Sequence, residues 1–283
     1  MIQSIPCKAY YDELATDYDQ LYVDAVSISE NSIVGSLISE YVFEGARILD
    51  LGCGSGLALE LLKQRPGHAA FQYVGVDISS RMARAGREKF RSDPNAEFHV
   101  MDMEQLSHFA DASVDVVLSL FGSFSHALNH EAAIAEFERV LKPGGRFLVM
   151  VYSRFSLRNI LRACFKISPG LLAEVRPYET RHTSGPPFVD ACFYDRELVN
   201  DAFRTFDDVR VEGLNCLFEL PFFDTWFGNS RKRAVIERLL RHEMKKLALW
   251  PYLCHSLIIT GRRPQRSGAN SNRPALFCVG RRG

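Results

Sequence analysis

The sequence predicts an α/β protein whose parallel sheet is doubly wound, with helices covering both of its faces. Three observations favour this class. Short apolar runs alternate with longer mixed segments between about residues 46 and 153, a glycine-rich turn follows the first apolar run, and 47% of the 283 residues are hydrophobic. A chain of this length and composition can bury a large core.

Five apolar runs each have the length and composition of a strand that is buried on both faces. They are RILDLG (47–52), YVGVD (73–77), AEFHVMD (96–102), VDVVLSL (114–120) and RFLVMVY (146–152). Before the last run, Ile134, Phe137 and Leu141 fall on one helical face, and a Lys-Pro-Gly-Gly turn follows at 142–145. This alternation indicates a parallel sheet with right-handed crossovers.

The N-terminal segment is predicted to pack on this core. Tyr11 and Tyr18, together with two leucines, share one face if residues 8–25 form a helix. We therefore expect residues 1–45 to form a helical lid over a central domain of residues 46–153.

The C-terminal half is predicted to add a cap and to complete a sheet of seven strands. A cap insertion is expected over 154–194, with a helix at LRNILRACF followed by a polar, proline-broken loop over 176–188. Residues 195–263 are expected to hold a helix (195–203), a strand (209–217), a helical insertion (218–250) and a last strand (254–262). The tail 264–283 has four arginines and no acid, and it is expected to be disordered.

Charge and cysteine content exclude several classes of function. The 34 basic and 34 acidic side chains cancel, which disfavours nucleic acid and anionic membranes as partners. The seven cysteines are scattered without a C-x-x-C motif, which argues against a disulfide framework and a zinc cage. The sequence has no secretion signal and no apolar run of about 18 residues, so a cytoplasmic location is expected.

The glycine-rich turn predicts a ligand site. Gly52, Gly54 and Gly56 follow the first strand and precede a helix, so backbone N–H groups are expected to point outward at the carboxyl end of that strand. The spacing is G-x-G-x-G, whereas dinucleotide sites use G-x-G-x-x-G. Asp50 at the strand end would repel a pyrophosphate and suits a cation. A ligand with a sulfonium and an ammonium group, such as S-adenosylmethionine, fits these demands better than NAD.

Four motifs in order make the chain resemble a class I S-adenosylmethionine-dependent methyltransferase of the small-molecule group, similar to the type 11 and type 25 families. They are Asp50–Gly56 (DLGCGSG), Val74–Ser79 (VGVDIS), Met101–Met103 (MDM) and Leu141–Gly145 (LKPGG). They span roughly two fifths of the chain. The resemblance implies a seven-stranded, Rossmann-like methyltransferase sheet and S-adenosylmethionine as the cofactor.

The resemblance also implies roles for the loop and the second strand. Gly52, Gly54 and Gly56 would let the backbone approach the methionine and ribose parts, and Asp50 would hold the ammonium group. Asp77 would accept both ribose hydroxyls. A tight turn at the glycines and a helix cap at Asp77 are the structural alternatives.

Further cofactor roles are implied at three other strand ends and in the lid. Ile78 would lie against the adenine, Asp102 would accept from the adenine amino group, and the Met103 backbone would contact a ring nitrogen. Ser119 and Leu120 would border the methyl group. For Asp102, a turn cap is the structural alternative. The lid element resembles the family's leading YDxxAxxYD segment, which closes over cofactor and acceptor; it contributes Tyr11 and Tyr18. Core packing is the alternative for these two rings.

Residues on the acceptor side are less well defined. His126, six residues after the fourth strand, is the candidate general base, with a structural histidine as the alternative. Catechol-type enzymes need acidic residues at this strand end where Ser119 stands, so no metal is predicted. The candidate substrate contacts are Phe121, Tyr178, Arg181, His182, Phe222 and Trp226.

These features predict a cytoplasmic enzyme that methylates an N, O or C atom of a small, partly apolar metabolite, in biosynthetic or specialised metabolism. The expected partner is that acceptor, and neither nucleic acid nor membrane is expected. The alternatives are a peptide or protein methyltransferase, a non-catalytic module that binds S-adenosylmethionine, and an NAD-dependent oxidoreductase.

Overall fold

The computed structural model of the chain describes residues 6–65, 67, 69–166, 169–179, 188–216, 233–244 and 250–265. Its strands are β1 (Ala46–Leu51), β2 (Phe71–Asp77), β3 (Ala96–Val100), β4 (Val114–Ser119), β5 (Leu141–Ser153), β6 (Val175–Glu179), β7 (Phe188–Tyr194), β8 (Asp207–Leu214) and β9 (Ser256–Arg262). Its α-helices are α1 (Cys7–Leu14), α2 (Ala25–Ser39), α3 (Leu57–Lys63), α4 (Ser80–Lys89), α5 (His130–Val140), α6 (Leu157–Lys166), α7 (Arg196–Ala202) and α9 (Arg233–Met244).

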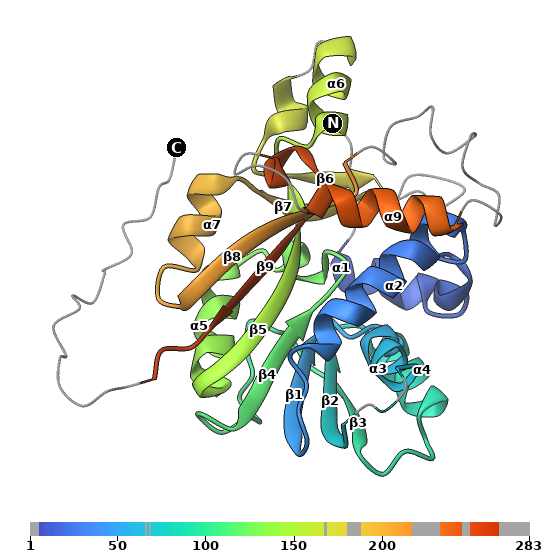
Figure 1. The fold of residues 1–283 in the computed structure, drawn as a ribbon, viewed down its shortest axis with the longest axis vertical. Helices are drawn as coiled ribbons and strands as arrows, with labels where there is room; N and C mark the ends of the chain where they lie inside the picture. Colours follow the sequence, from blue (N-terminus) through green and yellow to red (C-terminus); the bar gives the residue numbers. More distant parts are fainter. Residues whose placement is uncertain are drawn as a thin grey trace, which may run out of the picture.

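The predicted doubly wound sheet is confirmed (Figure 1). Strands β1 to β5 are parallel and run in the order β3-β2-β1-β4-β5. β9 pairs antiparallel along β5, and β8 pairs antiparallel with β9. The seven strands predicted from the apolar runs therefore all form, in the Rossmann-like arrangement that the motifs implied.

The cap holds two strands that the sequence analysis does not predict. β6 pairs antiparallel with β7, and β7 adds to the carboxyl end of β5 through Tyr152 and Ser153. The prediction that residues 176–188 form a loop is therefore wrong at its two ends, which belong to β6 and β7. Pro177 breaks the usual strand pattern, but β6 pairs only with β7 in the described structure, and an edge strand tolerates proline.

The lid is made of separate short elements, so the prediction of one helix over 8–25 is wrong. α1 ends at Leu14, a single 3-10 turn covers Tyr18–Gln20, and α2 begins at Ala25. Asp24 starts α2 because its carboxylate accepts from the N–H groups of Val26 and Ser27 at 2.9 and 3.1 Å. This cap begins a new helix at Ala25, so residues 8–25 do not form one continuous helix.

Helices cover both faces of the sheet, and neighbouring residues of β1 show the division. Ile48 packs with α2, α3 and α9 on one face, and Leu49 packs with α5 and α7 on the other. Figure 1 shows α2 and α9 side by side over the first face. The second face holds a fully packed aromatic cluster made of Phe137, Phe147, Phe203 and Phe206.

The strand order reverses between β1 and β4, which places a topological switch point at their carboxyl ends. Open α/β sheets bind ligands in the crevice outside such a point. The lid lies over this end of the sheet (Figure 1). Of the predicted C-terminal features, residues 218–232, 245–249 and the tail from 266 lie outside the described residues.

Candidate functional site

The turn after β1 can be built only with glycine at critical positions. Gly52 and Gly56 have φ of +71° and +90°, in the left-handed region that favours glycine. A Cβ at Gly52 would lie 2.6 Å from Cβ of Ser123, and one at Gly56 would lie 2.8 Å from the ring of Phe90. The backbone of the loop between β1 and α3 is therefore not covered by side chains of its own at these positions, and Ser123 and Phe90 pack directly against it.

Asp50 has a buried carboxylate, and only one of its two oxygens is hydrogen-bonded within the described residues. It is 2% exposed, and Oδ2 accepts a hydrogen bond of 2.6 Å from the hydroxyl of Tyr73. Oδ1 is buried and has no hydrogen-bond partner among the described residues. Burial raises the pKa of Asp50 to about 7, against the opposing hydrogen bond from Tyr73. A buried oxygen of this kind is suited to a donor that carries positive charge.

Asp77 ends β2 and connects the loop to α4. Its two oxygens accept from the N–H groups of Gly54 and Ser79, both at 2.8 Å. Burial raises the pKa of Asp77 to about 6, although these two backbone hydrogen bonds lower it. The cap of α4 is Ser79, whose hydroxyl accepts from the N–H of Met82. Asp77 thus contacts the glycine loop itself, where a ligand in that loop would meet it.

Ile78, Asp102 and Met103 lie on the more open side of the loop. Ile78 is 36% exposed, and the exposed Asp102 accepts from the N–H of Glu104 at 2.9 Å, as in a turn. Met103 reaches the loop, because its Cε would be 3.3 Å from a Cβ at Gly52. Of the three, Met103 is shown against the loop, and Asp102 makes the turn contact that was its structural alternative.

Ser119 and Leu120 lie behind the loop. Ser119 is fully buried and donates to the carbonyl oxygen of Leu51 at 2.8 Å, which ties β4 to β1. Leu120 packs into the core cluster on the α2 side. The Ser119 hydroxyl is therefore used inside the sheet, where it positions the start of the glycine loop.

Two lid aspartates hold Tyr11 and Tyr18 over the site. Asp12 accepts from the Ser79 hydroxyl at 2.7 Å and from the Arg81 N–H at 3.2 Å. Asp19 accepts from the hydroxyl of Ser55 in the glycine loop and pairs with Lys89 at 2.9 Å. The sequence analysis assigned no role to these aspartates. The Tyr-Asp pairs at 11–12 and 18–19 were the available signal.

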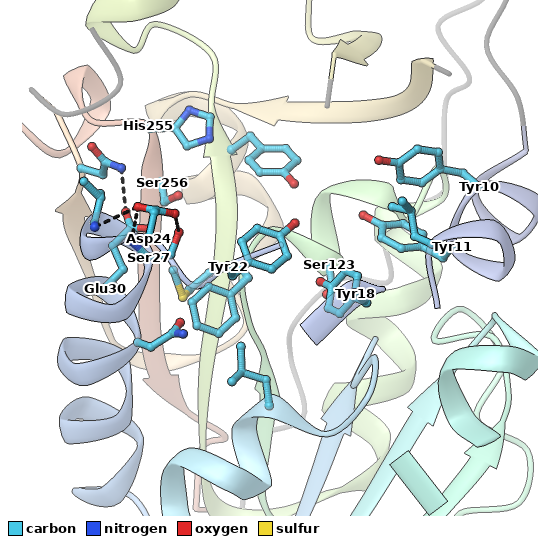
Figure 2. Close-up of a pocket in the computed structure, with 18 residues that line it drawn as sticks. Tyr10, Tyr11, Tyr18, Tyr22, Asp24, Ser27, Glu30, Ser123, His255 and Ser256 are labelled. Carbon is cyan, nitrogen blue, oxygen red and sulfur yellow. Dashed lines mark hydrogen bonds between the residues drawn. The ribbon is translucent and has the colours of Figure 1, made fainter. Parts of the chain in front are cut away.

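A cavity of about 160 Å³ lies between the lid and the ends of the central strands (Figure 2). Its lining includes Phe121, a candidate substrate contact, and five tyrosines: Tyr10, Tyr11, Tyr18, Tyr22 and Tyr152. Ser123 lies between this cavity and Gly52. Other candidate substrate residues cannot be placed there: Arg181, His182, Phe222, Trp226 and the side chain of Tyr178 lie outside the described residues.

The sequence analysis missed the C-terminal wall of the cavity. Asn215, His255 and Ser256 line it, at the end of β8 and the start of β9. β9 runs antiparallel, so its first residues meet the carboxyl ends of the parallel strands. Polar residues at these strand ends were the signal that could have located them.

His126 forms a partly buried pair with Tyr11. Its Nδ1 lies 3.1 Å from the carbonyl oxygen of Asp190, and its Nε2 lies 3.2 Å from the Tyr11 hydroxyl. A carbonyl can only accept, so Nδ1 carries the proton and the lone pair of Nε2 faces Tyr11. Burial lowers the pKa of His126 to about 4 and raises the pKa of Tyr11 well above its usual value. Both side chains are therefore neutral near pH 7.

The described residues contain no group of three metal-binding side chains that could hold an ion. Within the same parts of the chain, no helix has the length and apolarity needed to cross a bilayer.

Comparisons with known proteins agree with this geometry. The family model described as a methyltransferase domain matches residues 49–149. An uncharacterized protein of Methanocaldococcus jannaschii is 32% identical over 74% of this chain and 79% of its own length. A ubiquinone/menaquinone biosynthesis C-methyltransferase of Methylococcus capsulatus is 30% identical over 58% of this chain and 68% of its own length.

Among solved structures, a SAM-dependent methyltransferase of Methanosarcina mazei has the same fold, with a TM-score of 0.56 at 20% identity over 81% of this chain and 98% of that one. The matched residues 49–149 include the glycine loop and both buried carboxylates, Asp50 and Asp77. The chain therefore belongs to the class I S-adenosylmethionine-dependent methyltransferases, and S-adenosylmethionine is its cofactor.

Proposed function

We propose that the protein methylates a small, partly apolar metabolite bound in the tyrosine-lined cavity, as a step in biosynthetic or specialised metabolism. The observation that carries the proposal is the continuity between cavity and loop. Ser123 lines the cavity and presses on Gly52, and the Tyr18 ring would lie 3.6 Å from a Cβ at Gly54. An acceptor in this cavity would lie directly beside the cofactor loop.

The buried carboxylates fit the charges of S-adenosylmethionine. The unpartnered Oδ1 of Asp50 would accept from the ammonium group, and Asp77 would accept from the ribose hydroxyls. Ile78, Asp102 and Met103 would border the adenine on the open side. When bound, the cofactor supplies a methyl group on a sulfonium, which is a strong leaving group.

The Tyr11–His126 pair would receive the proton that the acceptor loses. The cofactor would supply the methyl group and its sulfur would keep the bonding electrons, so the residues of the chain would only have to accept the proton that the acceptor loses. The acceptor proton passes to the Tyr11 oxygen while the Tyr11 proton moves to Nε2 of His126. Because buried His126 is a weak base, most of the rate enhancement would come from positioning.

Tyr11→Phe tests this pair. It keeps the ring and removes the hydroxyl, so we expect kcat to fall roughly tenfold, less than for a dedicated base, with little change in cofactor affinity. Tyr41→Phe, which alters a partly buried tyrosine outside the cavity, is the matched control. If kcat were unchanged across the pH range, the Tyr11–His126 pair would have a structural role only.

Cofactor affinity is expected to depend on pH through Asp50 and Asp77. Their pKa values are raised to about 7 and about 6, and a bound cation favours the ionised carboxylates. Binding therefore releases protons, and affinity should fall roughly tenfold from pH 8 to pH 6. The ligand-free protein should show the opposite trend, because a carboxyl with a raised pKa contributes stability below about pH 4 that is lost as pH rises through 6 to 7. Titration calorimetry in two buffers would reveal the proton release, and a flat profile would contradict the assignment.

The function itself can be tested with methyl-labelled S-adenosylmethionine and a panel of one-ring phenols, amines and acids, with products identified by mass spectrometry. Labelled small products would support the proposal. Label on peptides or proteins alone would favour the protein-methylating alternative. Tight cofactor binding without product would favour a non-catalytic module, and NAD binding without S-adenosylmethionine binding would contradict the proposal.

A small-molecule acceptor is supported over nucleic acid by the balanced charge of the chain and by the limited size of the cavity. The cytoplasmic location, the lack of a metal and the domain boundaries at 45, 153 and 194 stay predictions.

A further inference from the structure

One wall of the cavity holds a buried oxygen without a donor. Asn215 is 3% exposed and lines the cavity. Its Nδ2 donates to Glu30 at 2.7 Å, whereas its Oδ1 is buried and has no hydrogen-bond partner in the described part of the chain. A buried acceptor without a donor is unfavourable, so this oxygen is suited to a ligand with an N–H or O–H group.

The orientation of this amide is fixed by its surroundings. Turning it over would place Oδ1 against the carboxylate of Glu30, two acceptors in contact. The backbone is held as well, because the Asn215 carbonyl accepts from the His255 N–H at 2.8 Å. Asn215 has φ of 62°, a left-handed conformation in which asparagine is among the tolerated residues. The fold therefore fixes the position of the Asn215 Oδ1 atom in the cavity wall.

The charge around this oxygen favours a cation. The cavity lining contains the carboxylates of Asp24 and Glu30 and, among the described residues, no lysine or arginine. Asp24 is engaged in capping α2, so Glu30 is the carboxylate that acts together with Asn215. The nearby rings of Tyr18 and Tyr22, 5.4 Å apart between centroids, add faces that attract positive charge.

This polar end is separated from the cofactor end. Figure 2 shows Glu30 and Asp24 on one side of the cavity and Ser123 and Tyr11 on the other, with Tyr22 between them. Ser123 adjoins Gly52, so methyl transfer would occur on its side. A group bound at Asn215 would therefore anchor the acceptor instead of receiving the methyl group.

We propose that the acceptor is a one-ring compound with an aliphatic amine, whose ammonium group binds Asn215 and Glu30 while its ring lies among the tyrosines. The size fits, since a cavity of about 150 Å³ holds a benzene ring and this one is about 160 Å³. The inference rests on the proposed function and specifies its substrate class. The methylated atom lies at the other end of the molecule, beside Tyr11.

Binding of three matched phenols tests the proposal. Tyramine, 4-(2-hydroxyethyl)phenol and 4-hydroxyphenylacetate differ only in the terminal group, and their affinities would be measured by calorimetry on protein saturated with S-adenosylhomocysteine. We expect the amine to bind at least about tenfold more tightly than the alcohol and the carboxylate to bind most weakly. Equal affinities, or binding of none of the three, would overturn the proposal.

Variants connect the preference to the residues. Glu30→Gln removes the charge but can still accept from Asn215, and Asn215→Gly removes the amide while suiting the left-handed backbone. Each should weaken tyramine roughly tenfold, and Glu30→Gln, which removes only the charge, should change the alcohol less than about twofold. Glu88→Gln, at an exposed position of α4, should change neither. Tyramine affinity that survives both cavity variants would overturn the assignment.

The same titrations distinguish a failure of the amine inference from a failure of the proposed function. Tight S-adenosylhomocysteine binding with no preference for the amine would overturn the inference and leave the proposed function standing. Failure to bind S-adenosylhomocysteine would overturn both.

Discussion

Asp77→Ala is expected to weaken S-adenosylmethionine binding roughly 100-fold, which corresponds to about 3 kcal/mol. The carboxylate is 8% exposed and contacts the glycine loop through the Gly54 N–H. On the proposed role of Asp77, its loss would remove two charge-assisted hydrogen bonds to the ribose, each worth about 1.5–3 kcal/mol, and loop rearrangement would compensate in part. Titration calorimetry at pH 8, where Asp77 is ionised, gives the affinity directly.

Two further variants isolate the cause. Asp77→Asn retains an oxygen that can accept one hydrogen bond, so the expected loss is about tenfold. Asp111→Ala removes a carboxylate that is 78% exposed and pairs with Arg139, and it should leave cofactor affinity unchanged. If Asp77→Ala bound the cofactor as well as the parent, Asp77 would have no place in the site.

Phe147→Ala is expected to lower the free energy of unfolding by about 3–5 kcal/mol. Phe147 is fully buried on the α5 side of β5, and its ring centroid lies 4.8 Å from that of Phe206 and 5.4 Å from that of Phe203. Alanine would leave a cavity among rings that the sheet and α7 hold apart. Domains are stable by only about 5–15 kcal/mol, so the variant should melt at a clearly lower temperature.

The control for this prediction is Phe165→Ala, because the Phe165 side chain is 84% exposed on α6. Its free energy of unfolding should change by less than about 0.5 kcal/mol. Urea titrations of both variants without cofactor provide the comparison. Equal stability of Phe147→Ala and the parent would show that the aromatic cluster can collapse around the missing ring.

The central sheet and the cofactor loop could be predicted because their signals are local. A strand buried on both faces is a continuous apolar run, and the turn from β1 to α3 needs glycine at φ values that other residues avoid. Asp50 and Asp77 follow from the same logic, since Asp50 is the second-to-last residue of β1 and Asp77 is the last residue of β2. The sequence thus specifies where two carboxylates meet the glycine loop.

The acceptor side could not be predicted, because its contacts join distant residues. Tyr11 and His126 are 115 positions apart, and Glu30 and Asn215 are 185 apart. The periodicity of apolar residues in the sequence does not indicate which distant residues form such pairs. Asp24 starts a new helix through a local cap, yet the prediction gave more weight to the spacing of Tyr11 and Tyr18. β6 was missed because Pro177 is typical of loops, and only its place at an edge makes it acceptable.

The cavity is closed by both ends of the chain around a middle that binds the methyl donor. Lid residues such as Tyr18 form one wall, and Asn215 and His255 form another, whereas the methyltransferase match covers only 49–149. On the proposed function, part of the acceptor wall therefore lies outside the stretch that matches the methyltransferase family, whereas Leu57, Phe121 and Ser123 of that wall lie within it. Exchanging the terminal stretches between relatives would change the outer part of the wall, and the transplanted ends must bring compatible partners for the hydrogen bonds of Asp12 and Asp19.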